Sequence, residues 1–205
     1  MYERYIKRFL DIVISLAALI VLSPVLLIVA VLIKLDSPGP VLFAQKRFGK
    51  NKTFFQIYKF RSMRTDTPKD VPTDALKGAN SFITPLGNVL RKTSLDELPQ
   101  LWNILRGDMS LIGPRPALWN QDDLMELRDQ YGASMIRPGL SGWAQVNGRD
   151  AIELEQKARY DGEYAANVSF LFDLKCLWMT FVKVIRREDI VEGAHDKKTK
   201  PEDAA

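Results

Sequence analysis

The sequence predicts a mostly helical α+β protein whose first segment is a re-entrant membrane helix. Two observations lead to this prediction. An almost wholly apolar run extends between residues 12 and 33, and two β-prone runs follow it, succeeded by stretches with helical periodicity. About 22 helical residues reach roughly 33 Å, which is enough to cross the hydrocarbon core of a bilayer. The rest of the 205-residue chain is long enough for one domain with a hydrophobic core.

Two features of the apolar run favour a re-entrant hairpin over a straight span. Pro24 lies near its middle and clashes with the carbonyl one turn back, so we expect a sharp bend there, with the Ser23 hydroxyl able to bond a freed carbonyl. Positive flanks normally stay cytoplasmic, and here both ends are basic: Arg4, Lys7 and Arg8 before the run, and Lys34, Lys46, Arg47 and Lys50 after it. A kinked helix that crosses the membrane once is the alternative. We expect no cleaved signal peptide, because no small-residue cleavage site follows.

Composition excludes several kinds of site. The formal charge of +4 favours an anionic partner without identifying it. Cys176 is the only cysteine and His195 the only histidine, which excludes a disulfide framework and a zinc site built on histidine and cysteine. A Ser-His-Asp triad is excluded because His195 lies in the tail that is predicted to be disordered. The sequence also lacks a glycine-rich phosphate loop, so a nucleotide would be held by arginines, lysines and a metal. A carboxylate is the nucleophile that remains.

The remaining segments predict one small sheet and a series of helices. Residues 41–48 and 53–60 read as a single β-hairpin with a four-residue loop. Thr84 and Pro85 are typical of an N-cap and a first-turn proline, and a second helix is predicted from Ser94 to Arg106, stopped by Gly107. The other predictions are a loop over residues 65–80, helices over 119–131, 152–164 and 173–187, and a disordered tail over 191–205.

The last predicted helix is amphipathic. Its apolar face can lie in a lipid headgroup layer, as several helices of this fold are expected to do, or it can pack on the protein core. The residues of that face are Leu174, Leu177, Trp178, Phe181, Val182 and Ile185.

The segment from Arg91 to Asn103 is the strongest candidate for chemistry. Ser94 and Glu97 fit an S-x-x-E capping box, and Asp96 complements the helix dipole, which is a purely structural interpretation. Alternatively, Asp96 and Glu97 hold Mg²⁺ and present a nucleophile at a helix N-terminus, where phosphate binds readily. The two interpretations are compatible, because a cap can also fix a catalytic side chain.

Two further basic sites could bind an anion. In a strand, Lys59 and Arg61 lie on the same face, which suits an anion but equally a solvated strand edge protected by charge. Arg115 lies between two prolines that fix its backbone, and this limits the entropy that its guanidinium loses on binding a phosphate or carboxylate.

Several blocks of sequence occur together in a recognisable order. They are DSPGP at 36–40, YKFRSM at 58–63, SLDELPQ at 94–100, GDMSLIGPRP at 107–116, and RPGLSG at 137–142 with QVNGR at 145–149. Through them the chain resembles the bacterial sugar transferase family, the small monotopic phosphoglycosyl transferases that start the assembly of surface glycans and glycoproteins. The similarity extends from Lys7 to about Arg187 and is to the minimal form, without the additional N-terminal spans of longer relatives.

The resemblance implies a fold and a reaction. It implies a re-entrant helix over residues 1–36, broken at Ser23 and Pro24, and a catalytic domain over 37–190 on the cytoplasmic face of the bacterial inner membrane. Asp96 would be the nucleophile on the β-phosphorus of a UDP-sugar, and Glu97 would position Mg²⁺ with it or act as a base. UMP would leave, and polyprenyl phosphate would take the sugar phosphate from Asp96. The implied substrate-binding residues are Lys59, Arg61, Arg91, Arg115 and Asp161.

Two other functions remain open beside this one. A lipid phosphatase could use the same carboxylate, and a non-enzymatic membrane scaffold could bind anionic lipid or nucleic acid by counterion release. The transferase interpretation expects a UDP-sugar, polyprenyl phosphate and the lipid bilayer as partners, no nucleic acid, and leaves a homodimer open.

Overall fold

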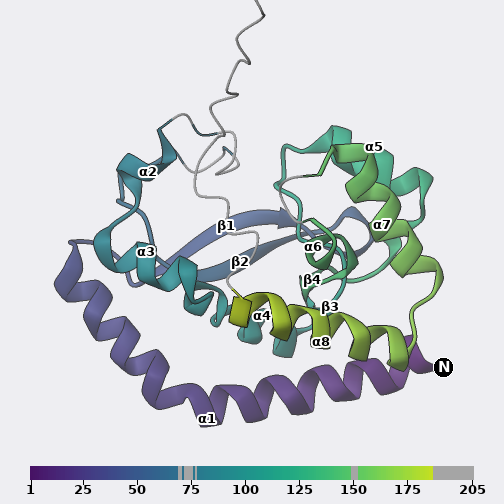
Figure 1. The fold of residues 1–205 in the computed structure, drawn as a ribbon, viewed down its shortest axis with the longest axis horizontal. Coiled ribbons are helices and arrows are strands. Elements are labelled where there is room, and N and C mark those ends of the chain that lie inside the picture. Colours follow the sequence, from purple (N-terminus) through teal and green to yellow (C-terminus); the bar gives the residue numbers. More distant parts are fainter. Residues whose placement is uncertain (69–70, 72–75, 77, 149–151, 187–205) are drawn as a thin grey trace, which may run out of the picture.

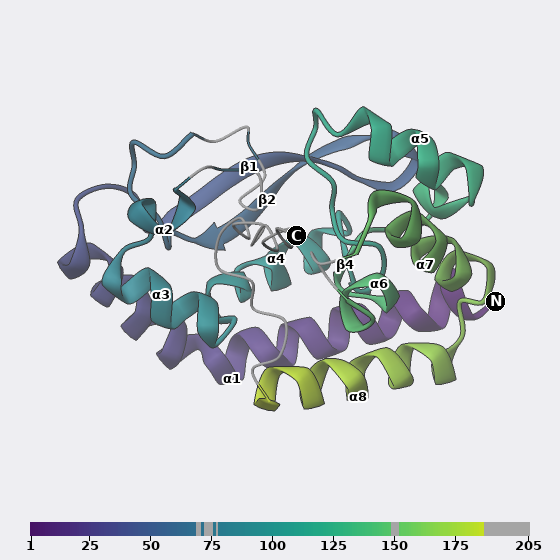
Figure 2. The same ribbon diagram turned by 45° about the horizontal axis from the view of Figure 1, so that its top comes forward.

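The computed structural model describes residues 1–68, 71, 76, 78–148 and 152–186, so the predicted tail over 191–205 and Arg149 lie outside the described residues. Helices α1 and α8 run side by side along the base of the molecule, and the hairpin β1–β2 crosses above them (Figures 1 and 2). The helices are α1 (Lys7–Asp36), α2 (Ala79–Phe82), α3 (Pro85–Lys92), α4 (Gln100–Arg106), α5 (Asp122–Gln130), α6 (Trp143–Val146), α7 (Leu154–Ala166) and α8 (Phe170–Arg186).

Helix α1 packs one stripe against the rest of the protein and leaves its other faces exposed. The buried stripe combines polar and apolar side chains at helical spacing: Lys7, Asp11, Ser15, Val29 and Ile33. The segment Tyr2–Asp36, which includes a π-helical turn before α1, is long and apolar enough to cross a membrane, and only 11% of its most apolar window is buried. Most of its apolar surface therefore has no protein cover in the part of the chain that the structure describes.

The predicted break at Ser23 and Pro24 is a bend and not an interruption. Helix α1 continues through Pro24, and Figure 1 shows it bending between its two halves. The Ser23 hydroxyl donates to the carbonyl of Ile20 at 2.8 Å, in the way expected of a polar side chain beside a proline.

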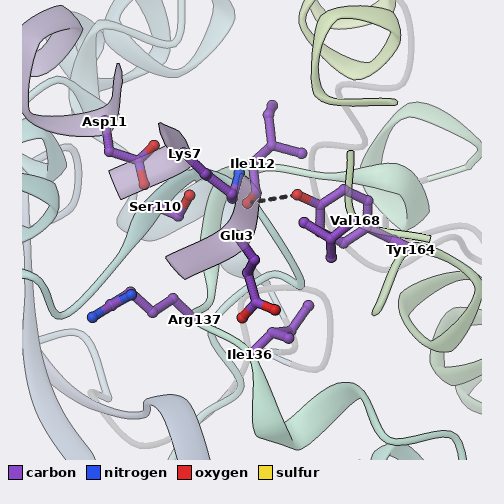
Figure 3. A pocket seen from close by; sticks show the side chains of 9 residues that line it. All are labelled: Glu3, Lys7, Asp11, Ser110, Ile112, Ile136, Arg137, Tyr164 and Val168. Carbon is purple, nitrogen blue, oxygen red and sulfur yellow. Dashed lines mark hydrogen bonds between the residues drawn. The ribbon is translucent and has the colours of Figure 1, made fainter. Parts of the chain in front are cut away.

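Buried polar contacts fix the beginning of α1 to the domain. Lys7 Nζ lies 2.7 Å from Asp173 Oδ2 in α8, and the Tyr2 hydroxyl donates to the same oxygen at 2.6 Å. Figure 3 shows Lys7 and Asp11 of α1 facing Ser110 and Tyr164 around a cavity of about 20 Å³. The start of the apolar segment is therefore held among polar groups of the folded domain.

Arg61 fixes the other end of α1. Its guanidinium is buried and donates to the carbonyls of Ser37 and Pro38, each at 2.6 Å, where the helix ends. Gly39 has φ +126°, and a Cβ there would lie 2.1 Å from Arg61 Nη1. A side chain at position 39 would thus displace the guanidinium, which explains a glycine in this turn.

The predicted β-hairpin is confirmed. Strands β1 (Leu42–Phe48) and β2 (Phe54–Phe60) pair antiparallel, with Phe48 opposite Phe54 and a short turn over Lys50–Lys52 between them. Asn103 of α4 joins the hairpin to the helix layer, because its side chain accepts from Tyr58 N at 3.0 Å and donates to Gln56 O at 2.7 Å.

The prediction of a single small sheet is wrong. Strands β3 (Ser110–Ile112) and β4 (Gly139–Ser141) form a second, parallel pair. Both strands are three residues long and lie in blocks rich in glycine and proline. They are too short to show an alternation of apolar and polar residues, so the sequence predicted turns there. Their backbones approach closely, since a Cβ on Gly139 would lie 2.1 Å from Gly113 N.

The prediction of a helix from Ser94 to Arg106 is also wrong for the first half of that range. Leu95–Glu97 form a 3₁₀ turn, and α4 begins only at Gln100. Ser94 makes no side-chain cap hydrogen bond and has φ 56°, so the predicted capping box is not formed. The predicted N-cap at Thr84 is confirmed, with its hydroxyl accepting from Gly87 N at 2.9 Å, and Gly107 ends α4 with φ 95°.

The three later predicted helices are confirmed as α5, α7 and α8, with shifted ends. Four residues of the predicted apolar face of α8 are exposed and not packed on the core: Leu174, Leu177, Trp178 and Phe181. On its other side Cys176 is fully buried, but a row of large apolar side chains is exposed: Phe170, Leu171, Leu174, Leu177, Trp178, Phe181 and Val184. Helix α8 itself lies at the base, beside α1 (Figure 2).

Replacing Arg61 tests how firmly the end of α1 is held. We expect Arg61→Gln to lower the free energy of unfolding by about 2–4 kcal/mol, because it removes several charge-assisted hydrogen bonds from buried carbonyls. Chemical denaturation in detergent measures this. Arg64→Gln is the matched control, since Arg64 pairs with Asp66 on the surface and such a pair contributes less than about 1 kcal/mol. Equal losses in the two variants would contradict the role of Arg61.

Candidate active site

A cavity of about 610 Å³ opens between the hairpin, the 3₁₀ turn over Leu95–Glu97 and helix α5. Among the described residues, the carboxylates that line it are Asp96 and Glu97, and basic side chains outnumber them: Arg47, Lys59, Arg61, Arg64, Arg91, Arg115, Arg128 and Lys157. An excess of positive charge in a concave site attracts an anion, and arginines are suited to phosphate oxygens.

The backbone presents the two carboxylates on a sharp turn. Helix α3 ends at Lys92, and Ser94 adopts a left-handed conformation that redirects the chain into the 3₁₀ turn carrying Asp96 and Glu97. A left-handed backbone costs a non-glycine residue about 1–2 kcal/mol, and such strain is concentrated at functional sites. The turn places both acidic side chains at the wall of the cavity.

Glu97 is held by two cations. Lys59 Nζ lies 2.7 Å from Glu97 Oε1, and Arg115 Nη1 lies 3.6 Å from the same oxygen. Lys59 is on β2, whereas Arg115 follows β3, so two segments that are distant in the sequence contact this carboxylate. Both cations help to hold Glu97 in place at the wall of the cavity.

Asp96 is buried beside these charges. Only 9% of its surface is exposed, and this burial raises the pKa of its carboxyl above the ordinary value, while the nearby Lys59 acts in the opposite direction. Burial also lowers the pKa of Lys59, an effect that Glu97 opposes. Burial and the neighbouring cations therefore act in opposite directions on the pKa of Asp96. The stability of its ionised form depends on those cations, as expected for a reactive carboxylate.

The pair Asp96 and Glu97 fits Mg²⁺ that is shared with a phosphate. Mg²⁺ in phosphoryl-transfer sites takes one or two carboxylates, and water and substrate phosphates complete its shell. No group of three or more histidine, cysteine, aspartate or glutamate residues that could enclose a metal occurs among the described residues. A metal bound here would therefore depend on ligand oxygens as well as on the protein.

Most predicted site residues come together. Lys59, Arg91 and Arg115 line the cavity with both carboxylates. Arg61 also lines it, but its guanidinium is occupied by the carbonyls at the end of α1. Asp161 is not among the lining residues, and its binding of substrate, like that of the others, stays a prediction.

Asp161 lies behind a cation that sequence reasoning missed. Its Oδ2 accepts hydrogen bonds from Arg128 Nε at 2.9 Å and Nη2 at 2.6 Å, and both residues are almost fully buried. Burial raises the pKa of the Asp161 carboxyl, and Arg128 opposes this. The signal in the sequence was a charged residue, Arg128, four positions after Leu124 on the apolar stripe of a helix.

Arg47 is a second cation that was missed as a site residue, because it was noticed only as a flank of the apolar run. Its guanidinium donates to the carbonyl of Pro116 at 2.9 Å and to the side chain of Gln45, which fixes the segment next to Arg115. Burial, with a contribution from Arg115, lowers the pKa of Arg47 to about 10. Lys157 of α7 was also missed as a residue of the cavity, because it belongs to no motif in the sequence.

Fold and site together define a class of protein: an apolar helix at the base supports a basic cavity that is lined by two adjacent carboxylates. The sequence pattern of the bacterial sugar transferase family matches residues 2–187. The chain belongs to this family.

Curated relatives agree with this assignment. An Escherichia coli K12 protein named UDP-glucose:undecaprenyl-phosphate glucose-1-phosphate transferase is 41% identical over 88% of this chain, which spans 40% of that protein. An Aeromonas hydrophila UDP-N-acetylgalactosamine-undecaprenyl-phosphate N-acetylgalactosaminephosphotransferase is also 41% identical, and the chain spans 44% of it. The exopolysaccharide production protein PSS of Rhizobium leguminosarum bv. phaseoli is 46% identical over 89% of this chain, which covers 96% of its length.

The buried pair of Arg128 and Asp161 yields a stability prediction. We expect Asp161→Asn to lower the free energy of unfolding by about 3 kcal/mol or more, because it leaves the Arg128 charge buried without its partner. The double variant Arg128→Met/Asp161→Leu should recover most of that loss, since both charges are then gone. Chemical denaturation of the single and double variants measures the coupling. Additive losses would show that the two residues act separately.

Proposed function

We propose that this chain transfers a sugar 1-phosphate from a UDP-sugar to a polyprenyl phosphate, giving a polyprenyl-diphosphate-sugar and UMP. The observation that carries the proposal is the pair of adjacent carboxylates, the buried Asp96 and the half-buried Glu97, set among arginines and lysines in a cavity of about 610 Å³. The names of the relatives from Escherichia coli and Aeromonas hydrophila, which differ in the sugar, agree with this reaction.

In the proposed first step, an oxygen of the Asp96 carboxylate attacks the β-phosphorus of the UDP-sugar. A new O–P bond forms, the bond between the β-phosphorus and the bridging oxygen breaks, and UMP leaves with the electron pair. In the second step an oxygen of the polyprenyl phosphate attacks the same phosphorus and releases the Asp96 carboxylate. A covalent intermediate lets one site serve a water-soluble donor and a lipid acceptor in turn.

The surrounding cations would lower the barrier by neutralising charge. Phosphoryl transfer is catalysed mainly by positioning and by electrostatic stabilisation of the transferring group. Arg91, Arg115 and Lys59 are placed for this, and Glu97 would hold Mg²⁺ with Asp96. That metal, when bound, would supply further neutralisation of the phosphate oxygens.

The membrane arrangement is part of the proposal. Both ends of α1 are bound to the same domain, through Lys7 and Asp173 at the start and Arg61 at the end. A helix tied at both ends to one domain favours re-entry on one side over a single crossing. The exposed row on α8 beside it would rest in the headgroup layer of the bacterial inner membrane, with the catalytic domain on the cytoplasmic face.

Replacing the proposed nucleophile tests the reaction. We expect Asp96→Asn to lower the rate of UMP release by at least about 10³-fold, because the amide keeps the shape and removes the nucleophile. Denaturing mass spectrometry of the native protein, quenched after mixing with donor alone, should show a phosphosugar adduct on Asp96. Asp123→Asn, an exposed position in the first turn of α5, is the matched control and should retain activity.

The alternatives give different results in the same assay. Release of inorganic phosphate without UMP would favour a lipid phosphatase, and an Asp96→Asn variant with intact function would favour a scaffold. An unmodified protein that nevertheless turns over would reject the covalent route.

Topology can be tested by labelling. We expect cysteines introduced as Tyr2→Cys and Lys50→Cys to react with a membrane-impermeant reagent from the same side of sealed vesicles. The native Cys176 is buried, and its burial raises the pKa of its thiol to about 12, so Cys176 should not react with the reagent. Labelling of the two positions from opposite sides would establish a single crossing and reject the re-entrant helix.

A further inference from the structure

The contact between Lys59 and Glu97 differs from the other ion pairs around the cavity. Lys59 Nζ lies 2.7 Å from Glu97 Oε1, both side chains are largely buried, and Asp96 also interacts electrostatically with Lys59. The ammonium group therefore lies against the carboxylate that is proposed to hold the metal. A metal ion bound by Glu97 Oε1 would compete with the Lys59 ammonium for the same oxygen.

Two cations cannot share that oxygen at close range without strong repulsion. Like charges repel strongly at short range in a partly buried site, because little water screens them, and a divalent ion doubles the repulsion that a single charge would exert. Either the ammonium keeps the metal away, or it moves when the metal binds.

Lys59 is better suited to move than the other cation on this oxygen. A lysine ammonium is a point charge on a flexible stem, whereas the guanidinium of Arg115 is planar and its backbone is fixed between two prolines. Arg115 also lies farther from Glu97, at 3.6 Å, where it can stay while the metal binds.

We propose that Lys59 is an exchangeable counter-ion of Glu97: a divalent cation displaces its ammonium group from the carboxylate, and the released ammonium then contacts the phosphate of the donor. In this role Lys59 neutralises Glu97 before the substrate arrives and prevents the two adjacent carboxylates from repelling each other. It is a positioning residue for the metal before it is a ligand for the phosphate. This inference rests on the proposed metal-dependent transferase function.

Metal binding tests the exchange without any turnover. Mn²⁺ binding to the full-length protein in nanodiscs can be followed by electron paramagnetic resonance, with no donor present. Since Lys59→Met removes the competing cation, we expect it to bind Mn²⁺ about tenfold more tightly than the native protein, a change equivalent to about 1.4 kcal/mol. Lys59→Gln should behave in the same way, while Lys59→Arg, which keeps the charge, should not gain affinity.

Lys157→Met is the matched control. Lys157 lines the same cavity and carries the same charge, but it has no ion pair with Glu97 among the described contacts. Any gain in Mn²⁺ affinity that Lys157→Met shows measures long-range electrostatics alone. The gain in Mn²⁺ affinity of Lys59→Met must therefore be larger. In a Glu97→Gln background that excess should disappear, because the carboxylate for which the two cations compete is gone.

Each outcome has one meaning. A Lys59→Met variant that binds Mn²⁺ no more tightly than Lys157→Met, or a native protein and variants that bind no Mn²⁺, would overturn the exchange. Failure of the transferase itself would appear elsewhere, as native protein without UMP release or adduct. If native protein forms the adduct and Lys59→Met shows no gain in metal affinity, only the exchange role of Lys59 is rejected.

Discussion

The arrangement of this protein depends most on the hydrogen bonds that the Arg61 guanidinium donates. It binds the carbonyls at the end of α1, and it directly follows the strand that carries Lys59. Helix ends leave carbonyls without partners, and burying them unsatisfied is costly. One side chain therefore satisfies the end of the apolar helix and sets its position relative to the cavity. The same requirement explains Gly39, because any side chain there would occupy the place of the guanidinium.

Several of the arginines that line the cavity already have a partner. Arg47 binds the carbonyl of Pro116, Arg128 binds Asp161, and Arg61 binds the turn after α1. These arginines fix the walls, and they still add positive potential to the cavity. In the proposed exchange, the Lys59 ammonium, which contacts Glu97, is the charge that moves when a ligand binds. A rigid cationic wall with a few adaptable charges is the preorganisation that phosphoryl transfer requires, because little reorganisation is then needed as charge develops.

Local patterns predicted those parts of the fold that local interactions determine. The hairpin, the cap at Thr84 and the stop at Gly107 follow from neighbours in sequence, and each is present. The parallel pair β3–β4 was missed because its strands are three residues long and come from distant segments, so only tertiary contacts define it. The capping box at Ser94 failed for a related reason, since the turn that presents Asp96 overrides the local preference. Arg128 could have been suspected as a charge on an apolar stripe, but Lys157 could not, because nothing near it in sequence indicates the cavity.

The size of the cavity bears on the order of the proposed steps. Sites for single small ligands measure roughly 300–1,000 Å³, and about 610 Å³ lies in the middle of that range. In a direct transfer, a nucleotide sugar and a lipid phosphate would have to occupy this site together, and their phosphate groups would compete for the cations near Asp96. Sequential occupancy avoids this conflict, because the nucleotide leaves before the acceptor phosphate enters. In the proposed intermediate, the sugar phosphate stays bound to Asp96 after UMP leaves and until the polyprenyl phosphate enters. On this argument the limited volume and charge of one site favour the proposed covalent route, independently of which sugar is carried.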